Sequence, residues 1–320
     1  MKPIWIITIL FIIFTAGCTS PQLSPTTTQP ATPVTLQETS VIQQVSQRQD
    51  NTETPMSTET IEVLPTESPT LEPTATPDLR LPPEEWKKWP IVPESSARVK
   101  EIYQRGIELG NNPQHFSKIG DCHNVRAAFM GLFDKPGWYV LRGQNAHLQP
   151  AIDWFAGSFD RDGYAVQGGF NAASILSPIW ADQEACLPNE NPVQCEVRIH
   201  KPTFAIVSLE LWWDGRTTER YETYIRGILD YLIEQGVVPI LSTKADNIEG
   251  DHSLNYTTAR LAYEYDLPMW NFWLAAQSLP NKGMDIERND GFHISTLAWT
   301  ERSFTALRTL EHLWQSVQEK

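Results

Sequence analysis

An α/β fold, in which helices cover both faces of a parallel β-sheet, is predicted for residues 84–320 of this chain. Short apolar segments alternate there with longer segments of helical periodicity, which is the order of elements in a parallel sheet. Residues 203–209 form a near-continuous apolar run, as expected of a strand that is buried on both faces. Distinctive polar groups follow the ends of the predicted strands, where open α/β sheets bind their ligands.

The predicted elements follow one another along the chain. Ser95 and Ser96 are N-cap candidates for a first helix, and Gly110 ends it. Strands are predicted at residues 116–119, 163–167, 203–209, 237–241 and 268–272. Longer helices are predicted at residues 217–235, 254–265 and 295–317. Five strands alternating with helices therefore predict one parallel sheet within a single domain.

An export signal is predicted at residues 1–18. Lys2 precedes an apolar run over residues 4–14, and small residues lead to Cys18, as in a secretory signal peptide. This end resembles a bacterial lipobox, in which the cysteine receives a diacylglycerol, although Thr15 stands where leucine is usual. We therefore expect an exported chain, held at the cell membrane or cell surface through lipidated Cys18. A plain cleaved signal and an uncleaved anchor are the alternatives.

Residues 19–83 are rich in Thr, Pro, Ser, Gln and Glu and contain almost no aromatic residues. A segment of this composition cannot bury enough apolar surface to offset its ordering entropy, so we expect a disordered linker. It either holds the domain away from a membrane or serves as a neutral spacer.

The charge and the composition argue against a nucleic-acid partner and against a membrane-spanning helix within the domain. A net charge of −14 argues against nucleic acid, because phosphate binding needs a basic face. Beyond the N-terminal run, no segment approaches the roughly 20 apolar residues of a membrane-spanning helix. Apart from an excess of tryptophan, with twelve residues, the composition is that of an ordinary globular domain. We expect this domain to be a monomer.

The four cysteines have different expected roles. Cys18 belongs to the lipobox, whereas Cys186 and Cys195 flank a short polar loop. Two such close cysteines usually pair in an exported chain, so we predict a disulfide between them. Their spacing is not a usual metal-binding spacing, and no metal site is predicted there. Cys122 is then the odd cysteine and needs an explanation.

Three short motifs stand near predicted strand ends or before the last helix: Gly120-Asp121-Cys122, Gly168-Gly169 and Asp290-Gly291-Phe292-His293. In their order and spacing they resemble the motifs of the SGNH (GDSL-type) hydrolase superfamily, and the match covers roughly residues 119–314. The resemblance implies a flavodoxin-like three-layer sandwich with a five-stranded parallel sheet. It also implies that a cysteine occupies the usual position of the nucleophilic serine.

The same resemblance implies a triad of Cys122, His293 and Asp290. The His293 imidazole would draw off the thiol proton, and the Asp290 carboxylate would fix the imidazole tautomer. A thioester acyl-enzyme would form and then be hydrolysed by water. The alternatives are that Cys122 is a small buried hydrophobe and that Asp290 and His293 only form a turn. Neighbouring His123 is expected to point elsewhere.

The oxyanion hole is the part of the site where this chain departs from the family. Cys122 and either Gly168 or Gly169 are expected to contribute to it, although the glycine pair is also typical of a tight turn. The family motif Gly-x-Asn-Asp after the third strand is absent, and Trp212 stands in the place of its asparagine. Indole has one N–H donor. We predict that Trp212 lines the site as a substitute donor or as a lid, with plain packing as the alternative.

The resulting hypothesis is an ester hydrolase that acts on acyl or acetyl esters of a carbohydrate or a lipid. It would need no cofactor and no metal, and its partner would be a small-molecule or glycan ester. The alternative is a catalytically inactive module of the same fold that binds cell-surface glycans, since aromatic residues near strand ends suit sugar rings.

Overall fold

A computed structural model describes residues 80–211, 217–288 and 290–318 of the chain. The predicted signal segment with Cys18, nearly all of the predicted linker at residues 19–83 and Trp212 lie outside these ranges. None of the helices in the described ranges has the length and apolarity that crossing a membrane requires.

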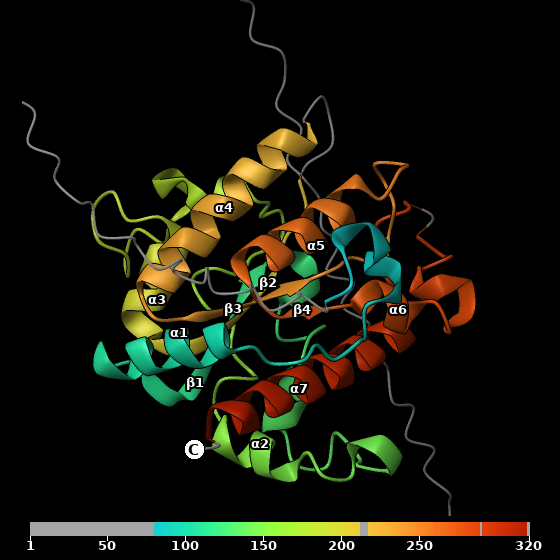
Figure 1. The fold of residues 1–320 in the computed structure, drawn as a ribbon, viewed down its shortest axis with the longest axis horizontal. Coiled ribbons are helices and arrows are strands. Elements are labelled where there is room, and N and C mark those ends of the chain that lie inside the picture. Colours follow the sequence, from blue (N-terminus) through green and yellow to red (C-terminus); the bar gives the residue numbers. More distant parts are fainter. Residues whose placement is uncertain (1–79, 212–216, 289, 319–320) are drawn as a thin grey trace, which may run out of the picture. The chain divides into compact units, whose positions relative to one another are not determined.

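The described residues form an α/β fold with one parallel sheet, as the sequence predicts (Figure 1). Its strands are β1 (Asn112–Gly120), β2 (Pro202–Ser208), β3 (Val238–Ser242) and β4 (Met269–Trp270), and they lie side by side in this order. Every neighbouring pair is parallel. All of their carboxyl ends therefore lie along the same edge of the sheet.

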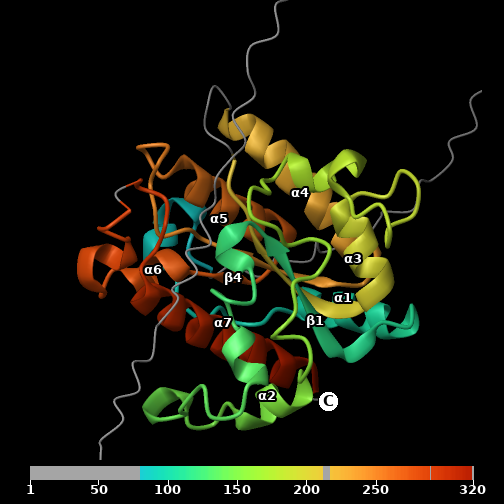
Figure 2. The same ribbon diagram turned by 180° about the vertical axis from the view of Figure 1, so that it is seen from behind.

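Helices cover both faces of the sheet. They are α1 (Ala97–Glu108), α2 (Gln149–Trp154), α3 (Pro192–His200), α4 (Thr218–Glu234), α5 (Ser253–Tyr265), α6 (Phe272–Ala276) and α7 (Thr296–Gln318). Helices α1 and α7 pack together on one face, while α4 and α5 pack together on the other (Figures 1 and 2). Short 3-10 helices occupy Pro83–Lys88, Cys122–Asn124, Gly131–Asp134, Gly143–Asn145, Ser174–Leu176, Pro178–Trp180 and Pro280–Gly283. The result is the expected three-layer arrangement.

The predicted strand at residues 163–167 is the exception, and in this part the prediction was wrong. Among the described residues, the segment joins the sheet only through an isolated parallel bridge between Val166 and Gly120. Two backbone hydrogen bonds flank the bridge: Gly120 N–H donates to Ala165 O at 3.0 Å, and Gln167 N–H donates to Gly120 O at 3.3 Å. The segment therefore lies beside β1, and counting it as a strand gives the flavodoxin-like order 2-1-3-4-5.

A turn on either side limits this bridge. The Val166 N–H donates to Gly163 O at 3.1 Å, so residues 163–166 form a turn and are not extended, and the Phe170 N–H donates to Gln167 O in a second turn just beyond the bridge. The Tyr164 N–H, on the side away from β1, donates to Glu196 Oε2 at 2.9 Å. The Glu196 carboxylate is held in place by Arg161, whose Nη1 donates to Oε1 at 2.6 Å.

The strands form the core of the domain. All residues of β2 from Pro202 to Val207 are buried, which agrees with the predicted apolar run. Trp270 of β4 is fully buried and stacks on Phe129 with ring centroids 5.8 Å apart. This packing fixes the carboxyl ends of the strands relative to one another.

The predicted disulfide is confirmed, and it joins Cys186 to Cys195. Cys195 is fully buried within α3, so the bond ties the preceding loop to the core. A capping box begins the same helix: Asn191 Oδ1 accepts from Gln194 N–H, and Gln194 Oε1 accepts from Asn191 N–H, each at 3.0 Å.

Candidate active site

The turn after β1 is built to present a side chain at the edge of the sheet. Asp121 is buried and caps the 3-10 helix Cys122–Asn124, since its Oδ1 accepts from His123 N–H at 2.9 Å and Asn124 Nδ2 at 3.3 Å. A side chain at Gly120 would meet Asn124 Nδ2 at 1.9 Å. Glycine is therefore required at this position because the turn folds back tightly on the strand.

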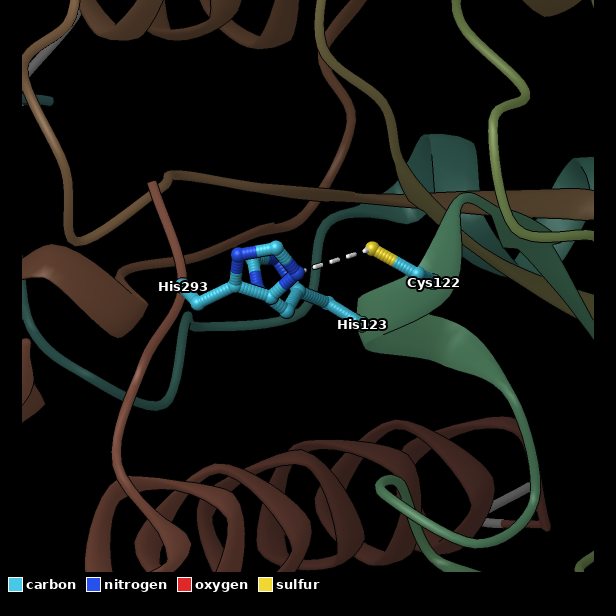
Figure 3. Close-up of side chains that lie close together, drawn as sticks. All are labelled: Cys122, His123 and His293. Atoms are coloured by element: carbon cyan, nitrogen blue, oxygen red, sulfur yellow. Dashed lines mark hydrogen bonds between the residues drawn. The ribbon is translucent and has the colours of Figure 1, made fainter. Parts of the chain in front are cut away.

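The turn brings the Cys122 thiol to the His293 imidazole (Figure 3). Cys122 Sγ lies 3.8 Å from His293 Nε2. On the other side of the ring, His293 Nδ1 lies 2.5 Å from Asp290 Oδ2. The three residues named for a triad thus form a continuous chain of polar contacts, although they come from opposite ends of the domain sequence.

Asp290 keeps a negative charge beside the imidazole. Its Oδ1 accepts from the backbone N–H groups of His293 at 2.9 Å and Phe292 at 3.0 Å. Partial burial raises the pKa of Asp290, but these hydrogen bonds and the imidazole outweigh it and bring the pKa to about 2. An ionised carboxylate on Nδ1 favours the tautomer whose Nε2 can accept the thiol proton.

Arg302 is a site residue that the sequence interpretation missed. It lies on α7, is 3% exposed, and donates to His123 O at 2.5 Å and to Asn124 Oδ1 at 3.0 Å. Burial lowers the pKa of Arg302 to about 10, with Asp121 and Cys122 opposing that change, so it is charged at neutral pH. The guanidinium therefore holds the turn in place and adds positive charge near the thiol.

A pattern in the sequence could have identified Arg302 as a buried charged residue. The helix residues Ala298, Arg302 and Ala306 are spaced by four and share one buried face. A charged residue on the apolar face of a helix calls for a buried partner. The partner of Arg302 is Asn124, which the sequence interpretation also missed. The Asn124 Nδ2 donates to Ser208 O at 3.0 Å and so joins the turn to the end of β2.

His123 does not point away from the site, and the expectation that it would was wrong. Its ring stacks on Phe292 with centroids 4.6 Å apart and meets the His293 ring edge-on at 5.4 Å. Burial lowers the pKa of His123 to about 3 and raises the pKa of Asp121 to about 6. His123 is therefore neutral at physiological pH.

The glycine pair forms a turn just beyond the bridge to β1. The Phe170 N–H donates to Gln167 O at 3.1 Å, and Gly169 has φ of +91°, as in a type II turn. Within the described ranges, the N–H groups of Gly168 and Gly169 have no hydrogen-bond acceptor. Gly120 and Val166 pair in parallel, and Cys122 and Gly168 each follow their bridged residue by two positions. The two turns therefore begin at the same edge of the sheet. Trp212 lies outside the described residues.

A second polar cluster, also missed, lies at the ends of β2 and β3. Lys244 Nζ contacts three carboxylates, those of Glu210 at 2.8 Å, Asp246 at 2.6 Å and Glu249 at 2.7 Å. Burial, reinforced by Asp246, raises the pKa of Glu210 well above its ordinary value. A cavity of about 20 Å³ beside this cluster has room for about one water molecule. We therefore interpret the cluster as a structural support of the candidate site and not as a second ligand-binding site.

Comparison with known proteins gave only distant similarities. No protein-family model matches the chain, and no curated protein matches it. It is similar to the structure of a protein assigned to the lipolytic G-D-S-L family from Desulfitobacterium hafniense DCB-2, with 12% identity, a TM-score of 0.42, and 61% of this chain and 99% of the other covered. It is similar to an acetyl xylan esterase at 13% identity and a TM-score of 0.39, over 61% and 97% of the two chains. It is also similar to a psychrotrophic esterase from Pseudoalteromonas sp., inhibited by monoethylphosphonate, at 12% identity and a TM-score of 0.40, over 62% and 97%.

Proposed function

We propose that this chain is an ester hydrolase that uses Cys122 as its nucleophile, His293 as the base and acid, and Asp290 to orient the imidazole. The observation that carries the proposal is the contact chain from Cys122 Sγ to His293 Nε2 at 3.8 Å and from His293 Nδ1 to Asp290 Oδ2 at 2.5 Å. These contacts lie at the carboxyl end of β1, where open α/β sheets hold their reacting groups.

The reaction proceeds through a thioester. His293 Nε2 takes the thiol proton as Cys122 Sγ attacks the ester carbonyl, and the carbonyl oxygen becomes an oxyanion. The imidazolium then gives its proton to the departing alcohol, which leaves an acyl group on Sγ. Water, deprotonated by the same imidazole, attacks the thioester and releases the carboxylic acid. The thiol is restored, so no oxidant or cofactor is consumed.

The oxyanion needs hydrogen-bond donors close to the thiol. We assign this role to the backbone at Cys122 and to the N–H groups of Gly168 and Gly169, which have no acceptor within the described part of the chain. Trp212 is proposed as the side-chain donor in place of the family asparagine. The substrates proposed are acyl or acetyl esters of a carbohydrate or a lipid.

The site is proposed to act outside the cell, with the domain anchored through lipidated Cys18 and residues 19–83 as its tether. If Cys18 carries the lipid, the full chain needs detergent for release, and Cys18→Ala moves it to the soluble fraction. Unchanged partitioning of this variant would reject the anchor.

An ester assay tests the proposed activity. The full chain carrying Cys18→Ala is assayed on short-chain aryl esters beside two further variants of it, Cys122→Ala and His293→Ala. Hydrolysis that is lost in both, with folding intact, is the expected result. Hydrolysis that survives both would place the chemistry elsewhere. An inactive parent would favour a module that binds glycans without cleaving them.

A further inference from the structure

Three side chains of the kind that bind transition metals converge at the end of β1 (Figure 3). They are the thiol of Cys122 and the imidazoles of His123 and His293, and one donor atom from each lies within 4.8 Å of the other two. Thiolate and imidazole are the preferred ligands of Zn²⁺, at about 2.3 Å for sulfur and about 2.0–2.1 Å for nitrogen. We propose that Cys122, His123 and His293 form a binding site for Zn²⁺.

The buried ring nitrogen Nε2 of His123 gives the first independent support for a metal site. Its Nε2 is buried and has no hydrogen-bond partner among the described residues. A buried polar atom without a partner costs free energy, and such atoms are rare in folded proteins. The ring also has little freedom to turn outward, since Phe292 stacks on it and His293 meets it edge-on. A bond from Nε2 to a metal ion would satisfy this atom where it stands.

The surroundings of the two imidazoles are the second support. Metal-binding histidines usually donate the ring N–H away from the metal to a carboxylate or carbonyl oxygen. His293 Nδ1 faces Asp290 Oδ2 at 2.5 Å, and His123 Nδ1 faces Asp121 Oδ1 at 4.0 Å. The His293 contact is a hydrogen bond of this kind. The His123 contact is too long for one, but it places a carboxylate on the Nδ1 side of the ring and leaves the buried Nε2 for the metal ion.

The local charge is compatible with a divalent cation. Arg302 lies close to the cluster, donates to His123 O, and opposes the binding of a cation. The carboxylates of Asp121 and Asp290 and a thiolate on Cys122 offset that charge. Binding replaces the thiol proton by the metal ion, so one proton passes to solvent and no electron is transferred.

Three protein ligands leave one coordination position open, which is the pattern of reactive rather than purely structural zinc sites. The ion would occupy both Cys122 Sγ and His293 Nε2, which are the atoms proposed for ester attack. Zinc binding and acyl transfer therefore exclude each other. The metal site itself is inferred from the three donors and does not depend on the proposed esterase activity.

Cobalt titration tests the site. The full chain with Cys18→Ala is prepared free of metal and without reductant, so that the Cys186–Cys195 disulfide stays closed. One equivalent of Co²⁺ is expected to produce a thiolate-to-cobalt charge-transfer band, and Zn²⁺ is expected to displace it. Because the readout is the absorbance of the metal site, an inactive esterase would leave the result unaffected.

Two His123 variants decide whether the third ligand is real. His123→Gln and His123→Phe should each weaken Co²⁺ binding by at least about 10- to 100-fold, the range for losing even a supporting group. Phenylalanine keeps the stack on Phe292, so circular dichroism should show a folded chain. His252→Gln is the matched control, because His252 Nδ1 is also buried and lacks a partner among the described residues. It should bind Co²⁺ as the parent does. No charge-transfer band in the parent, or unchanged affinity in both His123 variants, would overturn the proposal.

Discussion

The guanidinium of Arg302 donates to the carboxamide oxygen of Asn124 at 3.0 Å and thereby joins the last helix to the turn that carries Cys122. Its other nitrogen donates to the backbone oxygen of His123. The position of the thiol therefore depends on a residue nearly at the other end of the domain. Arg302 touches none of the reacting atoms proposed here, so it is a positioning residue.

Replacing Arg302 should slow the chemistry of Cys122. Arg302→Met removes the donor to Asn124 Oδ1 and the positive charge near the thiol, so alkylation of Cys122 at neutral pH should slow by about tenfold. Lysine keeps the charge but not the fork of donors, so Arg302→Lys should recover part of the rate. Arg308→Met, on the same helix, is the control. Equal rates in all four proteins, measured with iodoacetamide, would show that Arg302 only packs.

Lys244 should be essential for stability. Lys244→Met leaves the carboxylates of Glu210, Asp246 and Glu249 next to one another without their cation. Removing one partner of a buried ion pair typically costs about 3–5 kcal/mol, and we expect a loss of that size in the free energy of unfolding. Urea denaturation at pH 7 measures it, with exposed Lys201→Met as the control. A loss no larger than that of the control would contradict the role given to Lys244.

The buried side chain of Lys118 should make the free energy of unfolding increase with pH. Burial lowers the pKa of this β1 residue to about 8, although its Nζ donates to Phe159 O at 3.0 Å. Between pH 8 and the ordinary lysine pKa of 10.5, the unfolded chain binds a proton at Lys118 that the folded chain does not. The free energy of unfolding should therefore gain a contribution that rises with pH across this window.

Lys118→Met should remove that rising contribution. The difference in stability between pH 8 and pH 10 should fall by about 1–3 kcal/mol relative to the parent. Lys135→Met, at a half-buried position with a side chain that is 36% exposed, is the control and should keep the parent slope. If the two variants have equal slopes in denaturant titrations at both pH values, the lowered pKa of Lys118 is wrong.

The sequence was sufficient for those parts of the fold and site that depend on local pattern. The β2 run predicted a strand buried on both faces, and the resemblance of residues 290–293 to a family motif implied that Asp290 contacts the His293 imidazole. The end of β1 predicted where Cys122 would lie, because parallel strands bring their carboxyl ends to one edge.

The parts that were missed depend on contacts between distant segments. The predicted fifth strand is limited to one bridge because residues 163–166 form a turn, and Glu196, from α3, holds the Tyr164 N–H of that turn. The Lys244 cluster needs Glu210 and Lys244 at neighbouring strand ends, which is known only once the strand order is known. The direction of His123 depends on the 3-10 helix that follows Asp121, and three residues are too few for periodicity to reveal it.

The central claim, that Cys122 carries the acyl group, is tested most directly by trapping the acyl-enzyme. The full chain with Cys18→Ala is mixed briefly with p-nitrophenyl acetate, quenched in acid and analysed by peptide mass spectrometry. One hydroxylamine-sensitive acetyl group is predicted on the peptide that contains Cys122, much reduced in His293→Ala and absent in Cys122→Ala. Turnover of the ester with the acetyl group on another residue, or with none on Cys122, would contradict the claim.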